Sequence, residues 1–310
     1  MAREIGVIGT FIRDTIITLD QQKVESIGGL YHALAYLACL AEPDTVIKPL
    51  CHVGADFSST VKHALKRFGN HVSFDLLHKV PQPNTQVTLI YRNSESRDEI
   101  TTRPMAAITP DEIRQLAGCE AVIVNLITGQ DVSLEALHHL KNGNGSPLVY
   151  FDLHSLALGI DAEGRRYYRE LPDWPSWIEA VDILQMNEKE AATLAGVADP
   201  GDEELISFGL RIVGEELTAC HITLGSRGSL LFYRDGNRVR HQAFRAEQNL
   251  ETIDIIGCGD AFGAAFITHF LQHGDFPGAT SFANHVAGLN CAFMGSLTPE
   301  NFRSHVQPYL

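Results

Sequence analysis

Two glycines and an acidic residue stand together at the start of an apolar, helix-like run near the end of the chain. Residues 254–266 read DIIGCGDAFGAAF. Gly257 and Gly259 allow a sharp turn that brings backbone amides close to a ligand. Unpaired N–H groups at a helix start, together with the helix dipole, form an anion site. Asp260 then has two interpretations: a helix N-cap, or a base that takes a proton from an attacking hydroxyl beside a bound phosphate.

Alternating strand-like and helix-like segments must position this turn. Continuous apolar runs such as Ala121–Asn125 are typical of parallel strands that are buried on both faces. The alternation predicts an α/β fold with a mostly parallel central sheet and helices on both faces. The expected strands are Glu4–Gly9, Val46–Val53, Val87–Tyr91, Ala121–Asn125, Leu148–Asp152, Val181–Asn187, Ala219–Leu224 and Ser229–Tyr233. The expected helices include Gly29–Leu40, Ser58–Phe68 and Asp202–Leu217.

Two stretches interrupt the alternation. Residues 11–27 read as short strands around a turn, and residues 83–103 have a hairpin pattern. We expect these two stretches to pair in space as a small β lid. Because the sequence has neither a linker nor an internal repeat, residues 1–310 are predicted to form one domain with this lid.

Composition and charge narrow the function classes. The formal charge is -14, with 24 Lys and Arg against 38 Asp and Glu, which argues against a nucleic-acid partner but not against a bound nucleotide. The sequence has no apolar run of about 18 residues, so no membrane span is expected. The N-terminus lacks the pattern of a secretory signal. Six cysteines without CxxC spacing fit a cytoplasmic location.

Residues 254–262 resemble the signature of the ribokinase-like carbohydrate kinases, the phosphofructokinase-B family. The usual form of this signature is Asp-Thr-x-Gly-Ala-Gly-Asp-x-Phe; here Ile255 replaces Thr and Cys258 replaces Ala. The resemblance implies a ribokinase-like fold and transfer of a phosphoryl group from ATP, with Mg²⁺, to a hydroxyl of a small sugar. It implies that Gly257, Cys258 and Gly259 hold phosphate and that Asp260 is the catalytic base. A monovalent cation such as K⁺ near the anion site is compatible with the resemblance.

Further motifs agree with the family on the nucleotide side. Asn187-x-x-Glu190 is similar to the segment that organises Mg²⁺, through water, and phosphate oxygens, although the same residues could form a helix cap. Thr223, Gly225 and Gly228 resemble the strand and turn beside the nucleotide, and out of context they make an ordinary hairpin turn. Asn284 resembles a residue of the helix that covers the adenine, or it occupies a solvated helix position.

The acceptor motifs match less closely. Asp14 follows the first strand, where the family commonly has an Asp that binds sugar hydroxyls, and Gly28-Gly29 match the family's glycine pair. The Asn usual four residues later is Ala33. The neighbouring Tyr31 and His32 either contact substrate or are interior helix residues.

Arg103, leaving the lid hairpin, and Asn125, ending a central strand, are also expected near the acceptor.

Three alternatives to a sugar kinase belong to different functional classes. A nucleoside kinase of the same fold would have an apolar or aromatic base pocket beside the lid. A non-catalytic sugar-binding relative would need no base, and residues 6–9 lack the GxGxxG spacing of a dehydrogenase. The identity of the sugar-like or nucleoside acceptor stays open. So does a homodimer, since some relatives pair their lids.

Overall fold

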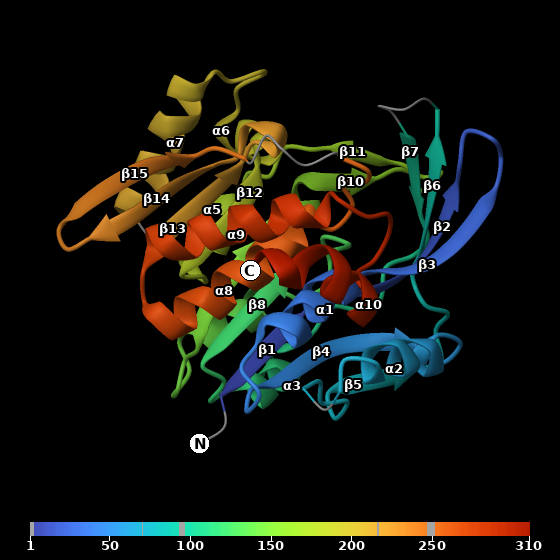
Figure 1. Cartoon of the computed structure of the whole chain (residues 1–310). Helices are drawn as coiled ribbons and strands as arrows, with labels where there is room; N and C mark the ends of the chain where they lie inside the picture. Colours follow the sequence, from blue (N-terminus) through green and yellow to red (C-terminus); the bar gives the residue numbers. More distant parts are fainter. Residues whose placement is uncertain (1–2, 70, 93–96, 216, 247–251) are drawn as a thin grey trace.

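The computed structural model describes residues 3–69, 71–92, 97–215, 217–246 and 252–310. Its central feature is a nine-stranded sheet in the order β15-β14-β13-β12-β9-β8-β1-β4-β5 (Figure 1). Its strands are β1 (Glu4–Ile8), β4 (Val46–Gly54), β5 (Leu77–Val80), β8 (Ala121–Asn125), β9 (Leu148–Asp152), β12 (Ile183–Asn187), β13 (Ala219–Thr223), β14 (Ser229–Asp235) and β15 (Arg238–Phe244). The seven strands β13, β12, β9, β8, β1, β4 and β5 are parallel to one another. The edge strand pairs β13–β14 and β14–β15 are antiparallel.

Helices cover both faces of this sheet, as the sequence predicted. One apolar core lies under α1 (Leu30–Leu40), α2 (Ser58–Lys66), α8 (Cys258–His273) and α9 (Phe276–Asn290), and the short α10 (Pro299–Asn301) follows. The other lies under α3 (Pro110–Ile113), α4 (Leu134–Lys141), α5 (Trp174–Glu179), α6 (Glu188–Ala195) and α7 (Asp202–Glu215). The fully buried β8 separates the two cores, which explains its continuous apolar run. None of the described helices is long and apolar enough to span a membrane.

A second sheet stands beside the first, on the right in Figure 1. Its strands are β2 (Phe11–Ile17), β3 (Lys23–Gly29), β6 (Gln86–Tyr91) and β7 (Arg97–Thr101), in the order β3-β2-β6-β7. Both stretches expected to form a lid therefore contribute strands to one small sheet. Ile12, Val87 and Leu89 on its inner side pack with Ile127 of the main body.

Several strands were not predicted from the sequence. Strand β5 pairs with β4 at one edge of the main sheet. Strand β15 pairs with β14 at the sheet edge, and a short hairpin, β10 (Leu158–Ile160) with β11 (Arg166–Tyr168), lies next to β7. Strands of three residues give too little pattern to be recognised.

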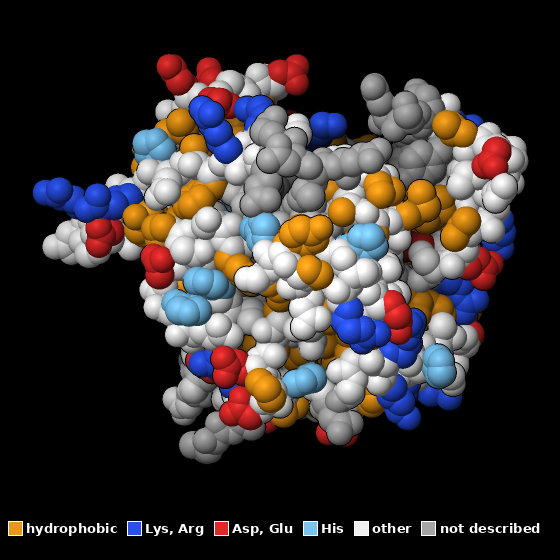
Figure 2. All heavy atoms as spheres, viewed as in Figure 1, with side chains coloured by type: hydrophobic (Ala, Val, Ile, Leu, Met, Phe, Trp, Pro, Cys, Tyr) orange, Lys and Arg blue, Asp and Glu red, His pale blue; other side chains and the backbone are white. Residues whose placement is uncertain are grey.

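On the face seen in Figure 2, basic and acidic side chains are interspersed.

Candidate active site

A cavity of about 750 Å³ opens at the carboxyl ends of the parallel strands, between the start of α8 and the inner side of the lid sheet. Asp152, Asn187 and Thr223 are the last residues of β9, β12 and β13, and all three line it. From β1 the chain adds β4 and β5 on one side and β8 to β13 on the other. Ligands of open α/β sheets bind at such a switch point.

The start of α8 forms one wall of the cavity. Gly257 is the N-cap of α8, with a φ of 77°, and no side chain caps this helix start. A Cβ at Gly257 would lie 2.8 Å from His32 Nδ1, so both the backbone angle and the space require glycine. Gly257, Cys258 and Gly259 all line the cavity, as expected for a turn whose amides face an anion.

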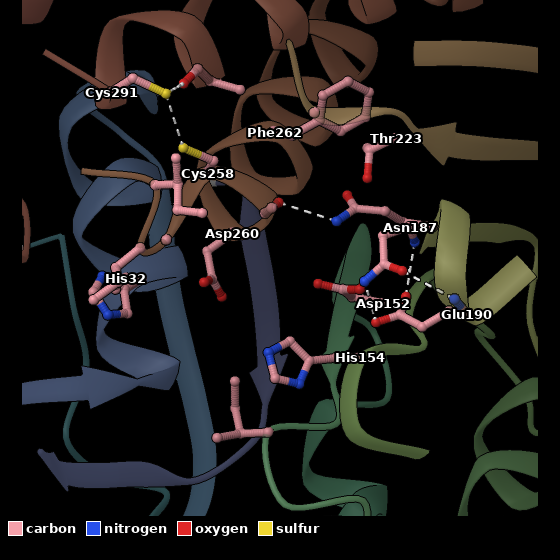
Figure 3. A pocket seen from close by; sticks show the side chains of 18 of the residues that line it. His32, Asp152, His154, Asn187, Glu190, Thr223, Cys258, Asp260, Phe262 and Cys291 are labelled. Atoms are coloured by element: carbon pink, nitrogen blue, oxygen red, sulfur yellow. Dashed lines mark hydrogen bonds between the residues drawn. The ribbon is translucent and has the colours of Figure 1, made fainter. Parts of the chain in front are cut away.

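Asp260 lies in the first turn of α8, and its carboxylate points into the cavity (Figure 3). Asn125 Nδ2, at the end of β8, donates a hydrogen bond of 2.5 Å to Asp260 Oδ1. Burial raises the pKa of Asp260 to about 7, although the bond from Asn125 opposes this rise. A carboxylate with such a pKa can accept a proton near neutral pH. Asn125 does not line the cavity, so its contact is with Asp260.

Two further carboxylates lie across the cavity from Asp260 (Figure 3). Asp152 and Glu190 are each 6% exposed. Burial raises the pKa of Glu190 to about 8. Burial, and then the charges of Glu190 and Asp260, raise the pKa of Asp152 well above its usual value. Buried acidic groups that repel one another would be stabilised by a cation, and their oxygens are the ligands Mg²⁺ prefers.

Asn187 and Glu190 also form a capping box at the start of α6. Asn187 Oδ1 accepts from the Glu190 amide at 2.9 Å, and Glu190 Oε2 accepts from the Asn187 amide at 2.8 Å. The helix-cap interpretation is therefore present in the structure, and it does not remove Glu190 from the cavity. Asp152 was not identified from the sequence as a site residue, although strand Leu148–Asp152 was predicted with the bounds that β9 has in the structure.

The wall beyond the glycine turn is made of small residues. Thr223, Gly225 and Gly228 line it from β13 and the turn that follows, and Asn284 lines it from α9. A Cβ at Gly228, with a φ of 98°, would lie 1.9 Å from Phe244 O. Asn284 Nδ2 is buried without a hydrogen-bond partner. A buried donor without a partner on this wall fits a site that binds a polar ligand.

The opposite wall contains the predicted acceptor residues. Asp14 on β2 and Gly29 at the start of α1 line the cavity, whereas Gly28 lies behind Asp14. A Cβ at Gly28 would lie 1.8 Å from Asp14 Oδ2, so glycine leaves room for that carboxylate. The sequence left two roles undecided for Tyr31 and His32. Tyr31 is an interior residue whose hydroxyl donates to Leu297 O at 3.2 Å, while His32 lines the cavity.

The guanidinium beside the lid comes from Arg166 on β11 and not from Arg103. Arg103 is exposed and is absent from the cavity lining, so its position does not support the predicted substrate contact. The Arg166 side chain is 6% exposed, and its Nε lies 2.8 Å from Glu99 Oε1. Both residues line the cavity beside His154. The pKa of His154 is lowered to about 4, mainly by burial and then by the charge of Arg166. Arg166 is the one Lys or Arg among the described residues of this lining.

Known proteins share both the sequence pattern and the fold. Ribokinase from Arabidopsis thaliana is 26% identical over 128 residues, 39% of this chain and 31% of that protein. Bifunctional protein HldE from Geobacter sulfurreducens (strain ATCC 51573 / DSM 12127 / PCA) is 22% identical over 292 residues, 91% of this chain and 54% of that protein. The chain thus spans about a third to a half of the length of these curated relatives.

Solved structures agree over nearly the whole chain. A sulfate complex of a pyrophosphate-dependent kinase in the ribokinase family has a TM-score of 0.78 at 19% identity, covering 97% of this chain and 99% of that one. Arabidopsis thaliana ribokinase complexed with ribose and ATP has a TM-score of 0.73 at 18% identity, covering 96% and 95%. The pfkB family carbohydrate kinase profile matches residues 48–301. The chain therefore belongs to the pfkB family of carbohydrate kinases.

Proposed function

We propose that this protein transfers the γ-phosphoryl group of ATP to a hydroxyl of a small sugar or polyol, with Asp260 as the catalytic base. The observation that carries this proposal is the pairing of a basic carboxylate with an anion site in one helix turn. The amides of 257–259 stabilise charge on the phosphoryl oxygens, and Asp260 takes the proton of the attacking hydroxyl. Asn125 orients that carboxylate through its 2.5 Å hydrogen bond.

The donor side fits a nucleotide. The small residues Thr223, Gly225 and Gly228 leave space beyond the glycine turn, and the orphan amide of Asn284 faces the same wall. The relative from Arabidopsis thaliana was solved with ATP, whereas other structural relatives are described as pyrophosphate-dependent. We favour ATP because the cavity lining includes Gly225, Gly228 and Asn284 in addition to the glycine turn, and these residues offer a surface for more than a diphosphate.

A divalent cation fits the acidic side of the cavity. Asp152 and Glu190 would hold Mg²⁺ directly or through water, because their buried carboxylates repel each other without a cation. When bound, Mg²⁺ neutralises charge on the transferring phosphate. Asn187 keeps Glu190 in place through the capping box. A monovalent cation near the glycine turn and a homodimer both stay predictions.

The acceptor side fits an uncharged polyol. Asp14 and Glu99 offer carboxylate oxygens that accept hydroxyl protons, while Arg166 is already paired with Glu99. A phosphorylated sugar fits this wall less well, because Arg166, the one Lys or Arg described in the cavity lining, is already paired with Glu99. The presence of a base argues against a non-catalytic sugar-binding relative.

A nucleoside kinase is the second candidate, and a specific observation favours it. Ile12, Val87, Leu89 and Ile127 form an apolar surface where the lid meets the cavity. Such a surface accommodates a nucleobase as readily as the C–H face of a sugar.

A screen of acceptors tests the proposal. Pentoses, hexoses, inositols, their phosphates and nucleosides would each be incubated with ATP or pyrophosphate and Mg²⁺, and the phosphorylated product measured by mass spectrometry. We expect a neutral polyol to be phosphorylated by ATP, and the Asp260→Asn variant to form little product. Saturable sugar binding without product from any pair would favour the non-catalytic alternative. Product from nucleosides alone would favour the nucleoside kinase.

A further inference from the structure

A second cluster of ligand-type side chains lies outside the candidate active site, at the far edge of the main sheet. His52 on β4 and His78 on β5 occupy opposite positions on neighbouring parallel strands. Glu112 reaches the same place from α3. One nitrogen of each ring and one carboxylate oxygen lie within 4.8 Å of one another. His52 Nε2 is 2.9 Å, and His78 Nδ1 is 3.3 Å, from Glu112 Oε1. All three residues are partly buried.

The hydrogen bonds of His52 show that its Nε2 faces an acceptor. His52 Nδ1 is 2.9 Å from Ala106 O, and a carbonyl can only accept, so Nδ1 carries the hydrogen. The neutral ring then presents the lone pair of Nε2 to the oxygen of Glu112. Two acceptors at 2.9 Å need a cation between them, either a proton on the imidazole or a metal ion. A ring nitrogen fixed by a backbone carbonyl is also the usual arrangement of a metal-binding histidine.

The carboxylate of Glu112 is prepared for the same role. Its Oε2 accepts from the Thr109 amide at 2.9 Å and from Thr109 Oγ1 at 2.8 Å, which leaves Oε1 for the two histidines. With Oε2 held by these two donors, Oε1 is directed at the ring nitrogens of His52 and His78.

We propose that His52, His78 and Glu112 form a binding site for a divalent metal ion of the Zn²⁺ class, with water completing the coordination. Two imidazole nitrogens and one carboxylate oxygen suit Zn²⁺ and related ions better than Mg²⁺, which prefers oxygen ligands alone. This site is independent of the proposed kinase reaction.

The position of the cluster indicates a structural role at the base of the lid. His78 lies just before the chain enters the lid strand β6, while Ala106 and Glu112 follow the lid strand β7. The two connecting segments already meet where Gln82 Nε2 donates to Pro104 O at 3.0 Å. A metal ion bound to both segments and to β4 would fix the base from which β6 and β7 extend.

The test uses the full chain after treatment with a chelator, titrated with Zn²⁺ by calorimetry in excess Mg²⁺, which occupies the acidic side of the active site. We expect a single equivalent of Zn²⁺ to bind and to raise the melting temperature. His78→Gln and Glu112→Gln should each abolish both effects, and Gln at 112 keeps the capping box with Thr109. The control His63→Gln, an exposed histidine on α2, should bind like the unchanged chain.

Substitution with Co²⁺ separates this site from a pair of thiols in the active-site cavity, Cys258 and Cys291, whose Sγ atoms lie 3.3 Å apart. Visible ligand-field bands without thiolate charge transfer are expected, and Cys291→Ser should not change them. Failure of Zn²⁺ to bind stoichiometrically, or equal binding by the Glu112→Gln variant, would overturn the proposal. In the first case the cluster is a histidine–glutamate ion pair; in the second the metal binds elsewhere.

Discussion

The two halves of the candidate active site are built in different ways. On the proposed donor side, consecutive backbone groups of residues 257–259 would hold the phosphate, with the side chains of Asp152, Glu190 and Asp260 around the same cavity. On the acceptor side, Asp14, Glu99 and Arg166 come from three separate strands of the lid sheet and of the hairpin next to it. On this proposal, phosphate binding at the turn tolerates changes of the side chains at 257–259, whereas acceptor binding depends on the side chains of Asp14, Glu99 and Arg166.

This difference indicates where substrate choice resides. The glycine turn is proposed to bind phosphate, which every donor of this reaction carries, so this turn needs no further specificity. The acceptor wall combines the paired Glu99 and Arg166 with the apolar surface of Val87 and Leu89. We infer that changes in the lid alter the acceptor, and that changes in the turn alter the rate.

The Asp260→Asn variant is expected to have the largest effect. Asn keeps the size of the side chain but loses its basicity, and a positioned base typically contributes about 10²–10⁴-fold. We expect kcat to fall at least ~100-fold while calorimetry shows ATP still bound. Asp275→Asn, at the N-cap of α9, is the matched control and should turn over normally. Near-normal turnover by Asp260→Asn would refute the assignment of the base.

The Asp14→Ala variant tests the acceptor half alone. Loss of a hydrogen bond to a charged group typically costs about 1.5–3 kcal/mol, or roughly ten- to a hundredfold in affinity. We expect the acceptor KM to rise by that factor while ATP affinity, measured by calorimetry, stays nearly intact. Asp20→Ala, an exposed position in the turn of the lid, serves as the control. A loss of ATP affinity without a loss of acceptor affinity would mean that the two halves are reversed.

The Glu190→Gln variant separates a metal role from a helix cap. Gln retains the capping box with Asn187 but removes a buried charge, so the fold is kept while cation affinity falls. The Mg²⁺ concentration for half-maximal activity should therefore rise. Glu188→Gln, in the same helix turn but outside the cavity lining, should leave it unchanged. If both variants show the same Mg²⁺ dependence as the unchanged chain, Glu190 acts as a cap only.

The contrast between a continuous turn and residues from separate strands also explains which parts of the site could be predicted from the sequence. The turn 257–260 is continuous, so its local pattern carries both the structure and the chemistry. Asp152 could have been found, because it ends a strand whose bounds were correct and strand ends meet at one edge. Arg166 could not, since its three-residue strand is defined by tertiary pairing beside β7 and not by its own periodicity. Arg103 was expected near the acceptor because it leaves the lid hairpin, but its side chain is exposed and lies outside the cavity lining.

The pH dependence of the reaction sharpens the role of Asn125. Asp260 acts as a base only when ionised, so kcat/KM should rise with pH through about 7. The hydrogen bond from Asn125 lowers this pKa, so Asn125→Ala should move the acid limb of the profile to higher pH. Asn142→Ala, at the C-cap of α4, should leave the limb in place. An acid limb that does not move would show that the bond does not tune the base.

The smallest effect is expected from Cys258→Ala, which replaces the residue at the centre of the glycine turn. Its thiol Sγ lies 3.3 Å from Cys291 Sγ, and Asn290 Nδ2 donates to it at 3.3 Å. Asn290 Nδ2 also donates to Ile256 O at 2.8 Å, so this amide keeps a partner in the variant. If the donor half works through its backbone, kcat and ATP affinity should stay essentially unchanged.

Cys291→Ala is the matched control, because it breaks the same sulfur contact from α9 without touching the turn. A large, equal loss of turnover in both cysteine variants would show that the thiol pair holds the turn in place. A loss in Cys258→Ala alone would show that the side chain at 258 takes part in phosphate binding. Either result would contradict a donor half whose function depends on backbone amides, and steady-state kinetics with the acceptor found by the screen distinguish the two.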